Sequence, residues 1–97
     1  MLDYAINDLA EEDLREACSY YNSCARGLAM QFLDAFDRAV EDLRVYPTWY
    51  PEVAPGIRRK IMHVYPFNIF YRFDSERIEV LAVYHSSRDP EKTLKRD

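Results

Sequence analysis

The sequence predicts an α+β fold, in which a first strand and a helical hairpin precede a three-stranded antiparallel meander. Two observations support this prediction. Apolar residues recur at three- and four-residue steps before Tyr46 and in alternation after Pro55, which are the periods of helices and of strands. The links between the later runs are short, and such links make neighbouring strands antiparallel, because a parallel return needs a dozen or more residues.

The composition is that of a packed globular protein. Of the 97 residues, 48% are hydrophobic and 14% aromatic, which argues against disorder. A chain of this length can bury one core, so we expect a single domain over residues 1–97. There is no apolar run of about 20 residues, as a membrane helix requires, and no signal-peptide pattern. We therefore expect a cytoplasmic protein without a membrane partner, in which Cys18 and Cys24 are reduced.

The charge is divided between the two parts of the chain. Residues 1–56 contain 4 Lys or Arg against 11 Asp or Glu, whereas residues 57–97 contain 9 against 6, and the net charge is −4. This distribution argues against general coating of nucleic acid. It leaves room for a local surface in the second part that binds an anion or a partner.

A first strand and a first helix are predicted at the N-terminus. Apolar residues at 2, 4 and 6 alternate with residues 3, 5 and 7, which suits a short strand at the border of the later sheet. Asp8 and Glu11 form an Asp-x-x-Glu start signal, with Asp8 as the capping residue, so a helix should begin near residue 9. Its predicted apolar stripe places Leu14 inside and Asp13 on another side, and its end lies near Asn22.

A second helix is predicted between Gly27 and Tyr46, and a proline-rich connector follows it. The helix is indicated by a sustained apolar stripe consisting of Leu28, Phe32, Ala35, Phe36, Ala39, Val40 and Leu43. A short link between two helices leaves them antiparallel, so we expect a hairpin laid against the sheet. The prolines at 47, 51 and 55 predict an extended connector.

Three strands are predicted in the remainder, over residues 57–65, 67–73 and 77–85. They are rich in β-branched and aromatic residues and are separated by Pro66 and by the polar turn Asp74-Ser75-Glu76. Both faces of this meander are largely apolar, which predicts one face under the helices and the other partly open. Arg72 stands among apolar neighbours, so its side chain should have a partner.

Cationic side chains gather on these three strands. They are Arg58, Arg59, Lys60, His63, Arg72, His85 and Arg88. Strands that adjoin can bring such groups to one side or rim of the sheet, where guanidinium groups bind phosphate or carboxylate and a histidine exchanges protons. The alternative is that the charges at 58–60 are the solvated guard of an edge strand.

Other chemistry is poorly supported by the spacing. The two histidines lie 22 positions apart and both cysteines belong to the helical half, so we expect no metal site and no cofactor. His85 and Ser86 are adjacent strand residues that point to opposite faces. A nucleophile with its base is therefore not expected there.

Several segments together resemble the RelE/ParE toxins of type II toxin–antitoxin modules, which are also called plasmid stabilisation proteins. They are Pro55–Arg59, Tyr65–Arg72, Ile78–His85 and Arg88-Asp89-Pro90, with weaker matches at Ala10, Asp13-Leu14, Tyr20-Tyr21, Phe32-Leu33 and Phe36. The resemblance is greatest to the ParE branch. It implies the same order of elements as the periodicity, a cognate antitoxin that wraps the toxin, and no direct DNA binding except through that antitoxin. The residues that bind the antitoxin are not identified by it.

The resemblance implies one of two activities. RelE-like members cut messenger RNA on the ribosome, whereas ParE-like members block DNA gyrase without being enzymes. If the chain were a nuclease, the resemblance would assign catalysis to Arg59, Arg72, His85 and Arg88. However, Asn68 stands where the nucleases commonly have an arginine, Ile61 stands in place of a second lysine, and the tail after residue 85 has no Tyr or His.

The incomplete nuclease set and the charge of −4 favour a ParE-type gyrase inhibitor. The side chains expected to bind the target are then Arg58, Arg59, Lys60, Arg72, His85 and Arg88. The alternatives are a ribosome-dependent messenger RNA endoribonuclease and an inactive or stand-alone domain of the same fold.

Overall fold

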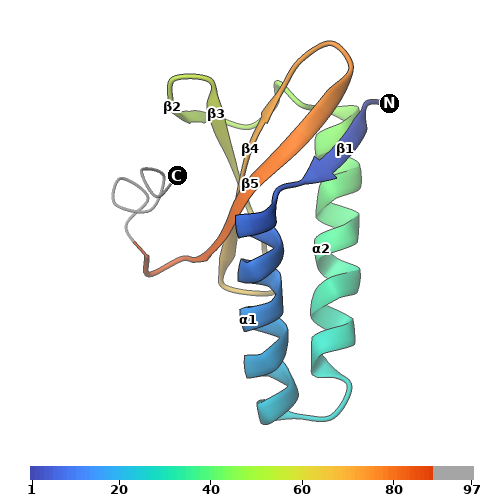
Figure 1. Ribbon diagram of the computed structural model, residues 1–97, viewed down its shortest axis with the longest axis vertical. Helices are drawn as coiled ribbons and strands as arrows, with labels where there is room; N and C mark the ends of the chain where they lie inside the picture. The colour runs from blue at the N-terminus through green and yellow to red at the C-terminus, as the bar shows by residue number, and fades with distance from the viewer. Residues whose placement is uncertain (89–97) are drawn as a thin grey trace.

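The computed structural model of this protein describes residues 1–88 and confirms the α+β fold. Its elements are β1 (Asp3–Ile6), α1 (Asp8–Cys24), α2 (Leu28–Val45), β2 (Glu52–Ala54), β3 (Ile57–Ile61), β4 (Phe67–Phe73) and β5 (Arg77–His85). The strands form one sheet in the order β1-β5-β4-β3-β2, and the two helices lie side by side as an antiparallel hairpin (Figure 1). No helix within residues 1–88 is both long and apolar enough to cross a membrane.

The sheet is mixed because β1 joins it beside β5. β1 runs parallel to β5, with Tyr4 opposite Ile78, whereas β3, β4 and β5 form the predicted antiparallel meander. β5 contains an irregularity, since Phe70 pairs with Ala82 and Tyr71 with Val80. The residue between those partners is Leu81, which makes this a β-bulge.

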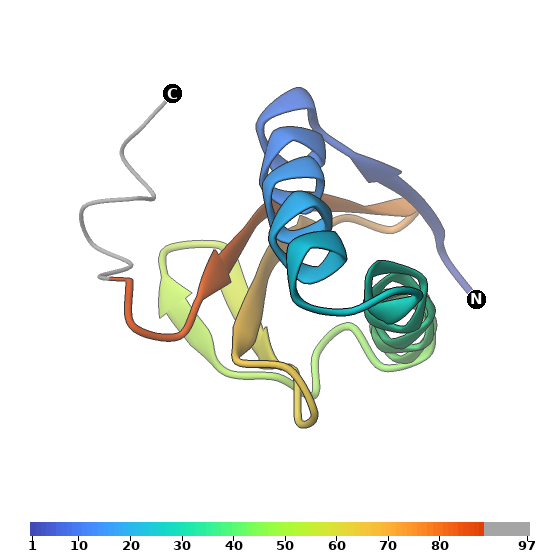
Figure 2. The same ribbon diagram turned by 90° about the horizontal axis from the view of Figure 1, so that it is seen from below.

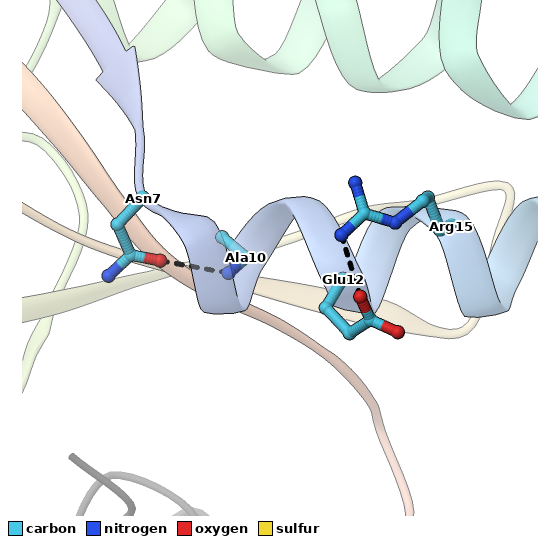
Figure 3. A network of polar contacts seen from close by, with 4 residues as sticks. All are labelled: Asn7, Ala10, Glu12 and Arg15. Carbon is cyan, nitrogen blue, oxygen red and sulfur yellow. Dashed lines mark hydrogen bonds and ion pairs between the residues drawn. The ribbon is translucent and has the colours of Figure 1, made fainter.

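α1 begins one residue earlier than predicted, and its capping residue is Asn7 rather than Asp8. The Asn7 side chain accepts a hydrogen bond of 2.8 Å from the Ala10 backbone amide (Figure 3). Asp8 is the first helical residue instead, where a negative charge still favours the helix N-terminus. Further along, Glu12 and Arg15 form an exposed ion pair, and Gly27, with φ of 81°, provides the left-handed residue that joins α1 to α2.

The main core lies between the helical hairpin and one face of the sheet (Figure 2). Phe32, Phe36 and Leu43 of α2 are at most 2% exposed, and Tyr71 of β4 is fully buried against them. The Tyr71 hydroxyl donates a hydrogen bond of 2.7 Å to the Pro47 carbonyl, which ties the proline-rich connector to the sheet. Burial raises the pKa of this phenol to about 12.

The second face of the sheet is not open in the way the sequence suggested. Phe70, Ala82 and Tyr84 form a small cluster there, and each is only 1% exposed. Ile57 packs against this cluster, and the Arg88 guanidinium lies 4.4 Å from the centroid of the Tyr84 ring. A cationic side chain therefore shields an aromatic ring on one face of the sheet.

Candidate functional site

The cationic residues predicted from the sequence are divided between the two faces of the sheet. Arg58 pairs with Tyr71, whose side chain belongs to the main core, so Arg58 and Lys60 stand on the helix side. Arg59 pairs with Phe70 and stands on the second face, because successive strand residues alternate. The structure thus does not gather these side chains on one side.

Arg58 and Lys60 are held by the protein itself. Arg58 Nη1 donates to the Tyr50 carbonyl at 2.6 Å and to the Thr48 carbonyl at 3.2 Å. Lys60 is 7% exposed, and its Nζ lies 3.6 Å from Asp42 Oδ2, 3.3 Å from the Tyr50 hydroxyl and 4.6 Å from the centroid of the Tyr50 ring. These contacts fix the connector and α2 to β3. The alternative prediction, in which the charges at 58–60 are solvated side chains that guard an edge strand, therefore does not describe Arg58 and Lys60.

The second face carries Arg59 and Arg72, with different surroundings. Arg72 has the partner that the sequence demanded, since its Nε and Nη2 each lie 2.8 Å from Glu79 Oε1. Arg59 has a buried Nε that finds no hydrogen-bond partner in the described structure. Arg59 therefore lies opposite Phe70 with a buried Nε donor that makes no hydrogen bond in the described structure.

His85 and Arg88 come together where β5 ends. The Ser87 backbone amide donates to His85 Nδ1 at 3.1 Å, so Nδ1 carries the lone pair and the proton of the neutral ring is on Nε2. The Ser87 hydroxyl lies 2.8 Å from the same nitrogen. The Arg88 amide closes this turn on the His85 carbonyl at 2.9 Å. His63 lies in the exposed turn between β3 and β4.

A groove of about 690 Å³ opens beside this turn, between α1 and the end of β5. Its lining includes Glu16, Tyr20 and Tyr21 from α1, and Phe67 and His85 from the sheet. The Tyr21 and Phe67 rings lie 6.2 Å apart, and the His85 ring meets Phe67 edge to face at 5.5 Å. Tyr20 is 62% exposed at the rim. The groove combines an aromatic floor with polar groups at its border.

Asp13 is a structural residue of this groove that the sequence analysis placed wrongly. It is 7% exposed, and its Oδ2 accepts a hydrogen bond of 3.0 Å from the Val83 backbone amide. The buried positions of α1 are Ala10, Asp13, Ala17 and Tyr21, so the inward stripe passes through Asp13 while Leu14 is half-buried. The sequence contained a signal for this, because Asp13 falls at helical spacing with Ala10 and Ala17, and a carboxylate on a buried helix face needs a hydrogen-bond partner.

Within residues 1–88 no three His, Cys, Asp or Glu side chains lie close enough to hold a metal ion. Asp89, Pro90 and the rest of the tail, which entered the resemblance and the nuclease comparison, lie outside the described residues.

Two of the three comparisons with known proteins find a match for this chain. Residues 4–90 match the model of the ParE toxin of the type II toxin–antitoxin system parDE. A solved structure described as a chromosomal ParDE toxin–antitoxin system from P. aeruginosa is similar in fold, with a TM-score of 0.74 and 20% sequence identity over 88% of this chain and 96% of that chain. The comparison with curated protein sequences gives no match.

Proposed function

Because this chain belongs to the family of ParE toxins of type II toxin–antitoxin systems, we propose that it inhibits DNA gyrase without catalysis and that a cognate antitoxin neutralises it. Its role as a toxin follows from the family. We infer for this chain that its target is gyrase, that it acts by binding rather than by catalysis, and that the antitoxin is its partner. The solved relative, described as a ParDE toxin–antitoxin system, supports a protein partner.

The position of Arg72 relative to His85 is the observation that supports inhibition over catalysis. Arg72 lies opposite Glu79 on the second face, while His85 lies on the helix side six residues further along β5, which is about 20 Å at the rise of a strand. A nuclease needs its proton-transfer group and its phosphate-binding groups about 3 Å from the same reacting atoms. Arg72 and His85 cannot meet that requirement together.

The pair at the end of β5 favours the second candidate, the ribosome-dependent endoribonuclease. His85 is exposed, its Nε2 is the protonated nitrogen of the neutral ring, and Arg88 follows it by three residues. One histidine and one arginine are the smallest set that could donate a proton and hold a phosphate. This observation makes His85 the residue to test.

The two candidates are separated by two assays on the purified protein. We expect inhibition of gyrase supercoiling at stoichiometric concentrations of toxin, and intact messenger RNA on translating ribosomes. The His85→Ala variant should still inhibit gyrase, because inhibition by binding requires no proton transfer. Codon-specific cleavage of messenger RNA that His85→Ala abolishes would establish the endoribonuclease instead.

A further inference from the structure

A pocket of about 170 Å³ lies between α2 and the turn that joins β3 to β4. Its basic side chains come from three different places, since Arg38 belongs to α2, Lys60 to β3 and His63 to the turn. None of the residues that line this pocket also lines the groove between α1 and β5. The pocket is therefore a separate feature of the molecule.

Lys60 is the buried cation of this pocket, and its polar contacts within the protein are long. The residue lines the pocket although it is only 7% exposed. Its Nζ lies 3.6 Å from Asp42 Oδ2 and 3.3 Å from the Tyr50 hydroxyl. An ammonium group has three donors, and its charge-assisted hydrogen bonds are about 2.7–2.9 Å long. Among the described residues, Lys60 thus has no acceptor at the distance that its charge favours.

The other two basic side chains of the pocket are exposed and unpaired. Within residues 1–88, neither the Arg38 guanidinium nor the His63 imidazole makes a hydrogen bond or an ion pair. A guanidinium has five N–H donors, and an imidazole has at least one in either protonation state. Asp42 provides a carboxylate in the lining, but its side chain is 58% exposed, so water screens its charge. The donors of the pocket therefore outnumber the acceptors beside them.

The size and the donors of the pocket suit a phosphate group. A protein cavity of about 150 Å³ holds benzene, so about 170 Å³ admits a group of similar size. A carboxylate has two oxygens and pairs best with one guanidinium in a fork, whereas a phosphate presents at least three acceptor oxygens, one for each basic group here. A nucleic-acid strand fits less well, because its binding depends on many basic contacts along the backbone and the chain has a net charge of −4.

We propose that this pocket binds a phosphate group, either the free ion or the terminal phosphate of a small ester. One phosphate oxygen accepts from the buried Lys60 ammonium, while Arg38 and His63 bind the other oxygens from the exposed side. The bound group joins α2 to β3 and to the turn, which stabilises the folded protein. Binding at this site requires neither gyrase nor the antitoxin.

The first test is a titration of the full chain with inorganic phosphate and with glycerol phosphate, at neutral pH and at an ionic strength kept constant with chloride. We expect the backbone amide resonances of His63 and Val64 to shift and to saturate, with a Kd below about 1 mM. Similar affinities for the two probes would assign the pocket to terminal phosphates, and binding of inorganic phosphate alone would assign it to the free ion. Shifts of these resonances that do not saturate below about 10 mM of either probe would overturn the proposal.

The second test compares two exposed arginines. Arg38→Gln removes a donor and a charge from the pocket, and Arg26→Gln removes the same charge from the link between the helices, which does not line it. We expect Arg38→Gln to weaken phosphate binding at least about tenfold and Arg26→Gln to leave it within about twofold of the unaltered protein. Equal weakening by the two variants would show that phosphate responds to net charge alone and would exclude the pocket.

The third test uses the buried cation. Lys60→Met also removes the contacts to Asp42 and Tyr50, so its stability has to be compared with and without phosphate rather than with the unaltered protein. Phosphate should raise the Tm of the unaltered protein and of Arg26→Gln, because it binds the folded state, and should leave the Tm of Lys60→Met unchanged. An equal rise of Tm in Lys60→Met would place the phosphate elsewhere. If Lys60→Met did not fold, the comparison of Arg38→Gln with Arg26→Gln would still decide.

Discussion

At the scale of single residues, three buried polar side chains of the described structure each hold two segments of the chain together. Asp13 joins α1 to the backbone of β5, and Lys60 joins β3 to Asp42 of α2. The Tyr71 hydroxyl joins β4 to the connector at Pro47. Burying a polar group costs free energy unless it is hydrogen-bonded, so the loss of any of these partners should be costly.

Asp13→Ala should lower the free energy of unfolding by about 2 kcal/mol, because it leaves the buried Val83 amide without its acceptor. Asp13→Asn should restore most of this loss, since the amide side chain still offers a carbonyl oxygen. Chemical denaturation measures both, with Glu12→Ala as the control in the exposed pair with Arg15. The control should change stability by less than about 0.5 kcal/mol. An equal effect of Asp13→Ala and Glu12→Ala on the free energy of unfolding would contradict a stabilising role of the buried hydrogen bond between Asp13 and the Val83 amide.

Tyr71 should make stability depend on pH in the alkaline range. Its pKa is about 12 in the folded protein, against an ordinary value of about 10 when unfolded. The stabilisation is therefore fully present below about pH 10, and it is lost as the pH rises toward about 12, because the unfolded state ionises first. Tyr71→Phe should lower the free energy of unfolding by about 1 kcal/mol at neutral pH, because the hydrogen bond to Pro47 is lost. Above about pH 10 the difference in free energy of unfolding between the unaltered protein and the variant should become smaller. If this difference in free energy of unfolding stayed constant up to about pH 12, burial would not be raising the pKa of the Tyr71 phenol.

At the scale of elements, the chain's periodicity predicts most of the fold, and long-range contacts decide the rest. The helices, β1 and the antiparallel meander follow from local patterns. β2 does not, because three residues between Pro51 and Pro55 have no readable period; it pairs with β3 in a hairpin in which Gly56 takes the left-handed φ of 74°. The candidate site was only partly predictable for the same reason. Arg72 lies opposite Glu79 through the sheet's register, and Arg88 lies over Tyr84 through the turn after β5, and the pattern of a single strand reveals neither contact.

Phe36 tests the packing of the helical hairpin on the sheet. The ring is 2% exposed at the centre of α2, so Phe36→Ala should reduce the free energy of unfolding by about 3–5 kcal/mol through lost burial and the cavity left behind. Met30→Ala on the exposed side of the same helix should cost less than about 0.5 kcal/mol. Thermal and urea unfolding of both variants measures the difference. A loss below about 1 kcal/mol for Phe36→Ala would mean that α2 contributes little to the core.

At the scale of the whole molecule, two surfaces of the described residues meet at the end of β5. One is the groove between α1 and the end of β5, where Asp13 accepts the hydrogen bond of the Val83 amide. The other begins at Arg88, whose guanidinium covers Tyr84 on the second face of the sheet, next to Phe70 at a ring distance of 5.6 Å. Arg88 borders both surfaces.

Under the proposed function, Arg88 should be an anchor of the toxin on gyrase. An exposed arginine stacked on a ring is preorganised for a carboxylate of a protein target, and interface anchors of this kind typically cost about 2 kcal/mol or more when truncated. Arg88→Ala should thus raise the concentration needed to inhibit supercoiling by about 30-fold. Arg77→Ala removes the same charge from the opposite end of β5, where the side chain is exposed, and should leave inhibition almost unchanged. Equal weakening by the two variants would show that net charge, rather than the site at the end of β5, governs the interaction.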